Sequence, residues 1–292
     1  MTSIPFNGQT YILPDEIIGI NNSKYRILEM LGRGGNGSVL ECENAATGET
    51  FALKVLLNLK SPRAERFERE IQIISCLSHE HIVTYITHGK ILITHTPRRE
   101  ARSRNKSYPN QFDVSFIIMR KADSNLREFL TQSSSPLRFE DYYGQFVGLA
   151  KALEKLHAVA MHRDIKPDNI LISADVWQIS DFGLCALIEG TEEQLTKAEE
   201  AVGPRYWMSP EAVSKAMGLG DVINCCSDLF QLASVFWFVV TRRPPIGVLT
   251  MNDWAGPPSL GQLLLDTLQH NPLRRPRSTT EFLQKLEEVK FS

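Results

Sequence analysis

The sequence predicts an α+β protein with a strand-rich first part and a mainly helical second part. Two observations support this prediction. Between residues 25 and 56, short apolar runs are separated by glycine-containing turns, as in antiparallel strands. From residue 139 onwards, apolar residues recur at helical spacing instead. Because strands followed by helices are typical of the α+β class, we expect a small antiparallel sheet with one helix, followed by a helical lobe.

The composition is that of a globular protein and excludes several function classes. The 292 residues suffice for two lobes with separate cores, and 42% hydrophobic with 23% charged residues is an ordinary balance. A net charge of -2 gives no general attraction to nucleic acid or to anionic membranes, so we expect neither as a partner. The most apolar stretch, 232–240, is far shorter than the ~20 residues that span a bilayer, which predicts no membrane anchor.

The N-terminal residues show no signal-peptide pattern. We interpret residues 1–24 as a leader that either packs on the first lobe or stays mobile, with Tyr11–Leu13 as a candidate short strand. No C-x-x-C pair occurs, so the cysteines are interpreted as free thiols in a reducing compartment, which predicts a cytoplasmic protein. The five cysteines lie at positions 42, 76, 185, 225 and 226.

A glycine-rich turn is the first motif with chemical meaning. Strand-like residues 25–31 precede it and 39–42 follow it, so the turn joins a β-hairpin. A dinucleotide-binding fold requires a helix after the glycines, and that alternative therefore fails. Glycine lets the main chain approach phosphate oxygens because no Cβ intervenes. The turn consists of Gly32, Arg33, Gly34, Gly35, Asn36 and Gly37, with Val39 at the start of the second strand.

A lysine among apolar neighbours and a helical glutamate follow the hairpin. Lys54 lies in the strand-like run 51–56, which also contains Ala52. Residues 62–77 show helical spacing, and Glu70 lies within them. A strand lysine often only extends its ammonium into water, so Lys54 alone is weak evidence. The apolar face of the helix consists of Phe67, Ile71 and Ile74, and the glutamates that compete with Glu70 are Glu65 and Glu68.

The strongest motif is H-R-D-I-K-P-D-N at residues 162–169, followed by D-F-G at 181–183. Asp164 is a carboxylate able to accept a hydroxyl proton, and Lys166 is a charge able to neutralise a phosphate. Asn169 and Asp181 offer the hard oxygen ligands that Mg2+ prefers. The residues between the two motifs read as two short strands around a turn, which would bring both ends of the segment together.

These motifs together resemble the eukaryotic-type (Hanks-type) protein kinase catalytic domain, serine/threonine branch. The resemblance covers residues 25–286 and implies a two-lobed kinase-like fold with ATP in the cleft. It divides the chain into a leader 1–24, a first lobe 25–119 with a basic insertion 94–113, and a second lobe 120–292. It implies transfer of the ATP γ-phosphoryl group to Ser or Thr hydroxyls of protein substrates, including this protein itself. The implied cofactor is Mg2+, with Mn2+ as an alternative.

The resemblance also assigns roles to individual residues. Met119 falls at the gatekeeper position, and Arg120–Ala122 form the hinge whose main chain meets adenine. A basic hinge is unusual for the family, and the sequence offers no explanation of it. Catalysis is assigned to Asp164, Lys166, Lys54 and Glu70, and metal binding to Asn169 and Asp181. Nucleotide binding is assigned to Gly32, Arg33, Gly34, Gly35, Asn36, Gly37, Val39, Ala52, Lys54, Met119 and Lys121.

The same resemblance predicts the contacts of the second lobe. Glu211, in S-P-E, is expected to pair with Arg275, and Asp228 to cap the backbone of residues 162–164. The stretch that ends at Ser259 is short, so one helix of the family is expected to be reduced. Helices are predicted around 126–130, 139–157, 232–240, 260–268 and 279–289.

Departures from the family pattern leave alternatives open. Gly203–Pro204 replaces the usual Gly-Thr pair and is closer to the tyrosine-kinase form, whereas Lys166 favours Ser/Thr specificity. A dual-specificity or tyrosine kinase therefore remains open, as does a pseudokinase that binds ATP as a regulatory module. Glu200 either replaces an activating phosphothreonine and pairs with Arg163, or belongs to a solvated acidic loop that also contains Thr191 and Thr196.

The basic insertion 94–113 has three readings. Its composition cannot build a core, so it is either a solvated loop, a docking site for an acidic partner, or a site of autophosphorylation at Ser103 or Ser107. The oligomeric state is not predicted.

Overall fold

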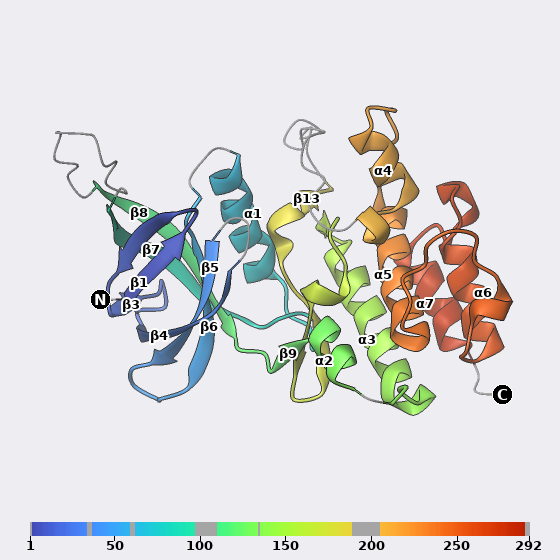
Figure 1. The fold of residues 1–292 in the computed structure, drawn as a ribbon, viewed down its shortest axis with the longest axis horizontal. Helices are drawn as coiled ribbons and strands as arrows, with labels where there is room; N and C mark the ends of the chain where they lie inside the picture. Colours follow the sequence, from blue (N-terminus) through green and yellow to red (C-terminus); the bar gives the residue numbers. More distant parts are fainter. Residues whose placement is uncertain are drawn as a thin grey trace. The chain divides into compact units, whose positions relative to one another are not determined.

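The computed structural model describes residues 2–33, 37–58, 62–96, 110–133, 135–188 and 205–289. The chain forms two compact units, drawn in Figure 1. The first contains Met1–Cys76 and Thr84–Lys121, and the second Leu77–Val83 and Ala122–Ser292. The division thus falls after residue 121, where the sequence suggested 119, and residues 77–83 group with the second unit.

The described residues of the first unit form an eight-stranded antiparallel sheet and one helix. The strand order is β1-β2-β7-β8-β6-β5-β4-β3, so strands remote in sequence are neighbours in the sheet. Its elements are β1 Thr2–Phe6, β2 Gln9–Leu13, β3 Glu16–Ile18, β4 Lys24–Arg33, β5 Gly37–Asn44, β6 Thr50–Leu56, α1 Arg63–Cys76, β7 Tyr85–Thr96 and β8 Asn110–Arg120.

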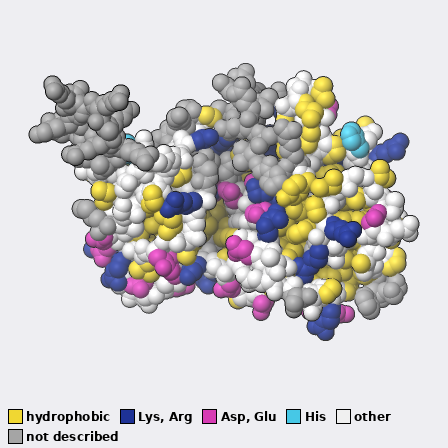
Figure 2. All heavy atoms as spheres, viewed as in Figure 1, with side chains coloured by type: hydrophobic (Ala, Val, Ile, Leu, Met, Phe, Trp, Pro, Cys, Tyr) yellow, Lys and Arg dark blue, Asp and Glu magenta, His cyan; other side chains and the backbone are white. Residues whose placement is uncertain are grey.

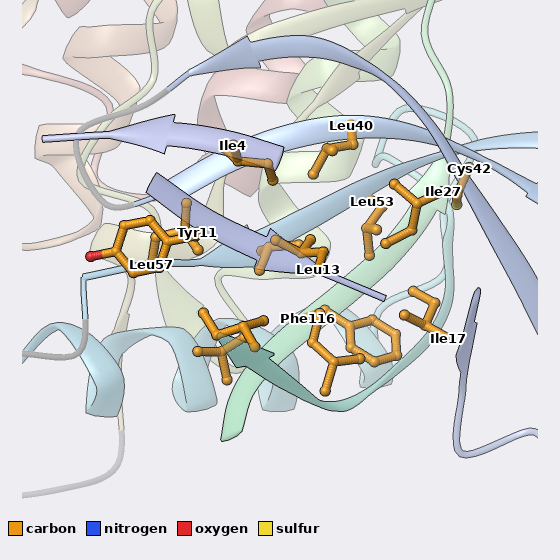
Figure 3. Close-up of a cluster of buried hydrophobic side chains, with 14 of the residues drawn as sticks. Ile4, Tyr11, Leu13, Ile17, Ile27, Leu40, Cys42, Leu53, Leu57 and Phe116 are labelled. Atoms are coloured by element: carbon orange, nitrogen blue, oxygen red, sulfur yellow. The ribbon is translucent and has the colours of Figure 1, made fainter. Parts of the chain in front are cut away.

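The N-terminal residues belong to this sheet. Of the two alternatives for the leader, packing on the first lobe is confirmed, because β1 and β2 form a hairpin whose second strand pairs with β7. Ile4 and Leu13 of this hairpin are fully buried. Figure 3 shows them in one cluster with Leu40 and Leu53 of the central strands. The hairpin therefore covers one face of the sheet.

The opposite face of the sheet carries α1. Phe67 and Ile71 of this helix pack against Leu56 of β6 and Ile117 of β8. Side chains alternate along a strand, so Lys54 lies on this same face, two residues from Leu56. The predicted apolar face of the helix is confirmed, since Phe67, Ile71 and Ile74 are all buried.

The bounds predicted for the basic insertion were too wide. Thr94 pairs with Gln111, and Asp113 with Leu92, so both ends of the range 94–113 are ordinary strand of the β7–β8 hairpin. The two strands are longer than predicted because the alternating side chains at both ends of the range fit a pleated sheet. The composition of the segment alone did not reveal this pairing. Residues 97–109, with Ser103 and Ser107, lie outside the described residues.

The second unit is mainly helical, as predicted. The buried α3 carries its expected apolar face, and the 232–240 run lies in the buried α5. The reduced region before α6 contains the short η4 among its described residues. The elements are β9 Ser124–Asn125, α2 Leu126–Gln132, α3 Phe139–Leu156, β10 Ala160–Met161, η1 Pro167–Asn169, β11 Ile170–Ser173, β12 Val176–Ile179, η2 Phe182–Leu184, β13 Ala186–Leu187, η3 Arg205–Trp207, α4 Pro210–Ala216, α5 Cys225–Thr241, η4 Met251–Asp253, α6 Pro258–Thr267, η5 Pro272–Arg274 and α7 Thr279–Glu287.

Hydrophobic side chains gather on the visible face of the second unit (Figure 2). Near the start of α4 a cavity of about 360 Å³ is lined by Phe230, Val248 and Leu268, among others.

None of the described helices is long and apolar enough to cross a membrane. All five cysteines are free, as predicted.

Candidate active site

The glycine hairpin of the first unit joins β4 to β5. Gly37 needs the absence of a side chain, because a Cβ there would collide with the main-chain oxygen of Val55 on β6. Arg33 donates to the sulfur of Met30, and Val39 pairs with Lys54 across β5 and β6. The predicted nucleotide-binding residues Gly34, Gly35 and Asn36 lie outside the described part of the chain.

Lys54 and Glu70 form an ion pair on the α1 face of the sheet. The Nζ of Lys54 lies 2.5 Å from Oε1 of Glu70, whose side chain is 3% exposed. Glu68, one predicted competitor, instead accepts a hydrogen bond from Ser115. The ammonium is therefore held in one place, and Glu70 is the glutamate that holds it.

The second unit brings the side chains of the H-R-D-I-K-P-D-N motif together around Asp164. Its Oδ2 accepts bonds from Nζ of Lys166 at 2.7 Å and from Nδ2 of Asn169 at 2.8 Å. Asn169 also donates to the main-chain oxygen of Asp164, which fixes the amide orientation. Burial raises the pKa of Asp164, and the Lys166 ammonium opposes that change. The arrangement presents a proton acceptor beside a fixed positive charge.

The backbone of this motif is anchored by α5. Asp228 accepts from the main-chain nitrogens of His162 at 2.7 Å and Arg163 at 2.8 Å, as predicted. Gln231, one turn further along α5, accepts from Ile165 and donates to the oxygen of Arg163, which the sequence did not predict. These bonds hold Arg163 at φ 70°, a left-handed conformation that non-glycine residues rarely adopt.

His157 connects this anchor to α7. Its Nε2 lies 2.9 Å from Oδ2 of Asp228, and its Nδ1 lies 2.7 Å from Oγ1 of Thr279. Burial disfavours the imidazolium most strongly, but together with Cys225 the contact with Asp228 outweighs this effect and raises the pKa of His157 to about 9. The same contact holds the pKa of Asp228 low against the effect of burial.

This pair predicts a loss of stability in alkaline solution. An unfolded histidine titrates near 6.5, so the stabilisation is complete below about that pH and is lost as the pH rises through about 9. We expect the thermal midpoint of the second unit to fall by about 5–10 °C between roughly pH 7 and pH 10 from the titration of this histidine. Thermal melts of the wild type and of His157→Gln across this range measure the effect. An equal decrease in the variant would contradict the prediction.

Asn169 and Asp181 are the predicted metal ligands. The strands β11 and β12 pair as predicted, and Ser180 donates both its N–H and its hydroxyl to the main-chain oxygen of Asn169. Asp181 follows directly at φ 62°, a left-handed conformation at the start of η2. One carboxylate and one amide oxygen fit Mg2+, which keeps several waters and uses few protein ligands. The donor chemistry of this loop therefore suits the ion.

Glu211 and Arg275 form the predicted pair, and both side chains are buried. The guanidinium contacts both carboxylate oxygens, at 2.8 and 2.9 Å, and lies over the ring of Phe230 at 4.9 Å. Ser227 donates to the same carboxylate at 2.6 Å. Burial raises the pKa of Glu211, but the bonds from Arg275 and Ser227 outweigh this effect and lower it. The pair joins the start of α4 to the segment after α6.

One further contact of the catalytic motif was missed from the sequence. Arg127 of α2 forms two hydrogen bonds to Asp168, at 2.7 and 2.8 Å, and its guanidinium also lies over Trp207. In the sequence, Arg127 stands out only as a basic residue in the first turn of a helix, where acidic residues are favoured. This signal is too weak to identify Asp168 as its partner. The predictions for Glu200, Thr191, Thr196 and Gly203–Pro204 concern residues outside the described part of the chain.

Comparison with known proteins identifies the family of the chain. The sequence model of the protein kinase domain matches residues 25–254, which is well over half of the chain. The chain therefore belongs to the protein kinase domain family.

Two similar proteins are kinases of mycobacteria. Serine/threonine-protein kinase PknD of Mycobacterium tuberculosis is 30% identical over 233 residues, which cover 78% of this chain and 31% of that protein. Serine/threonine-protein kinase PknH of Mycobacterium bovis is 29% identical over 253 residues, covering 83% of this chain and 38% of that protein. The chain thus spans about a third of the length of these relatives.

A solved structure confirms the predicted fold. The kinase domain of PknI from Mycobacterium tuberculosis matches with a TM-score of 0.65 at 20% identity, over 95% of this chain and 99% of that one. The antiparallel sheet of the first unit and the helical second unit are those of the kinase fold.

Proposed function

We propose that this chain transfers the γ-phosphoryl group of ATP to Ser and Thr hydroxyls of proteins. The observation that carries the proposal is the cluster of Asp164, Lys166 and Asn169, in which a carboxylate only 13% exposed accepts hydrogen bonds from a lysine and from a candidate metal ligand. Little covalent chemistry is required in phosphoryl transfer, so positioning and electrostatics supply the rate.

Each site residue has a role in this proposal. Asp164 orients the substrate hydroxyl and accepts its proton, while Lys166 offsets charge on the transferred group. Lys54, held by Glu70, positions the α- and β-phosphates, and the glycine hairpin covers them. Asn169 and Asp181 would hold Mg2+, or Mn2+ in its place. The ion would supply positive charge to the phosphate oxygens.

Ser/Thr specificity rests on Lys166 and on the relatives. Both PknD and PknH are named serine/threonine-protein kinases, and they match most of this chain. A dual-specificity enzyme and a pseudokinase are the alternatives, supported by Pro204. We further propose protein substrates and a cytoplasmic location, the latter supported by the free cysteines. Docking of an acidic partner within residues 94–113 stays a prediction.

Phosphoryl transfer tests the proposal directly. The protein is incubated with Mg-ATP labelled in the γ-phosphate, alone and with a generic acceptor protein, and the labelled amino acids are identified. We expect label on Ser and Thr, and none with Lys54→Met, because that variant lacks the charge that Glu70 holds. Label on Tyr would overturn the specificity. Bound ATP without any transfer would favour the pseudokinase.

A further inference from the structure

The basic hinge, which the sequence left unexplained, has acidic partners within the first unit. Lys121, at the end of β8, places Nζ 2.6 Å from Oε1 of Glu41 on β5. Arg120 lies 3.7 Å from Glu49, in the turn between β5 and β6. The two basic residues are adjacent in sequence, but their ion pairs differ in burial. The side chains of Lys121 and Glu41 are 37% and 13% exposed, against 55% and 52% for Arg120 and Glu49.

The register places Glu41 on the face of the sheet that carries Lys54. Glu41 is directly opposite Ala52, and Ala52 is directly opposite Met119, so the three form one row across β5, β6 and β8. Val39, Lys54 and Ile117 form the row two residues away, which points to the same side. Lys121 lies two residues beyond Met119 and reaches back across β6 to Glu41.

Burial decides which of the two pairs has energetic weight. Exposed ion pairs contribute little, because water and salt screen them and two flexible side chains must be ordered. The Lys121–Glu41 pair is shorter and its carboxylate is largely removed from water, so its attraction is screened less. The residue directly opposite Glu41 on the middle strand is Ala52, whose side chain is small.

We propose that Glu41 and Lys121 are positioning residues for the base of ATP. Their ion pair joins the return strand of the glycine hairpin to the end of β8, where the main chain is expected to bind adenine. It fixes the separation of these two strands on the nucleotide face, beside Ala52 and Met119. This inference rests on the proposed function, and it assigns to Glu41 a role that the catalytic motifs do not.

The test is calorimetric binding of ATP and of adenosine to the full chain. We expect Glu41→Gln to raise Kd for ATP by about 3- to 10-fold, as the loss of a coupled contact predicts. Kd for adenosine should rise by the same factor, because the pair acts at the base and not at the phosphates. The double variant Glu41→Gln/Lys121→Gln should bind ATP no more weakly than Glu41→Gln. The swapped variant Glu41→Lys/Lys121→Glu should recover affinity for ATP.

The neighbouring ion pair of the same unit provides a matched control. Glu49→Gln removes the exposed pair with Arg120 and should change Kd by less than about 2-fold. The inference is overturned if Glu41→Gln leaves Kd for adenosine unchanged, or if it only lowers the melting temperature. The wild type separates the two proposals. If it fails to bind ATP, the proposed function falls along with this inference; if it binds and the variants match it, the inference alone is wrong.

Discussion

Replacing Asp164 with asparagine is expected to lower kcat by about 10²- to 10⁴-fold, the usual contribution of a general base. The amide keeps the size of the side chain but cannot accept the hydroxyl proton. Lys166 and Asn169 both donate to Oδ2 of Asp164, and no donor among the described residues bonds to Oδ1. In the proposed mechanism, the carboxylate of Asp164 receives the proton of the substrate hydroxyl.

The kinetic pattern distinguishes a lost base from a misfolded loop. KM for ATP should stay within about 3-fold of the wild type, because the interaction is made in the transition state. Asp168→Asn is a useful comparison, since it removes the carboxylate bound by Arg127 in the same loop. If Asp164→Asn kept more than about a tenth of wild-type kcat, the assignment of the base would be wrong.

The catalytic segment was predictable because its signals are local. The strands β11 and β12 are short apolar runs, and Ala174 and Asp175 between them both adopt positive φ in the turn. The helices α1 and α3 follow from the spacing of their apolar residues, which burial confirms. Motif, turn and periodicity are all contained within a few residues, so a single sequence suffices to identify them.

Contacts between remote strands were not predictable in the same way. Tyr11 pairs with His95, and nothing near either residue indicates the partner. The Lys121–Glu41 pair joins residues 80 positions apart and depends on the register of three strands. Register is set by packing of the whole sheet, so it is absent from any local pattern. The N-terminal hairpin was therefore left between two alternatives.

The site was predicted in its chemistry but not in its backbone. Asp164, Lys166 and Asn169 were named from the motif, and they lie together. The positive φ of Arg163 and Asp181 has no sequence signature, because neither residue is a glycine. Such conformations persist when surrounding contacts compensate their cost, as the hydrogen bonds of Arg163 with Asp228 and Gln231 do.

Replacing Arg275 with methionine is expected to destabilise the second unit by about 3–5 kcal/mol, the usual cost of breaking a buried ion pair. The carboxylate of Glu211 is 4% exposed and, among the described residues, would keep Ser227 as its one side-chain donor. Its desolvation would then be poorly compensated. Because Ser227 adjoins Asp228, which caps the catalytic loop, phosphoryl transfer should fall as well. Urea denaturation measures the stability change.

The loss of stability in Arg275→Met should arise from the unpaired charge of Glu211 and not from the loss of the arginine side chain itself. Glu211→Gln/Arg275→Met should therefore recover part of the loss, since removing both charges leaves no buried ion. The exposed pair between Lys151 and Glu287 is the control, and Lys151→Met should cost less than about 1 kcal/mol. Equal losses for Arg275→Met and Lys151→Met would show that burial does not control the strength of these pairs. Additive losses in the double variant would show that the two side chains are not coupled, and that the segment after α6 is held to α4 by other contacts.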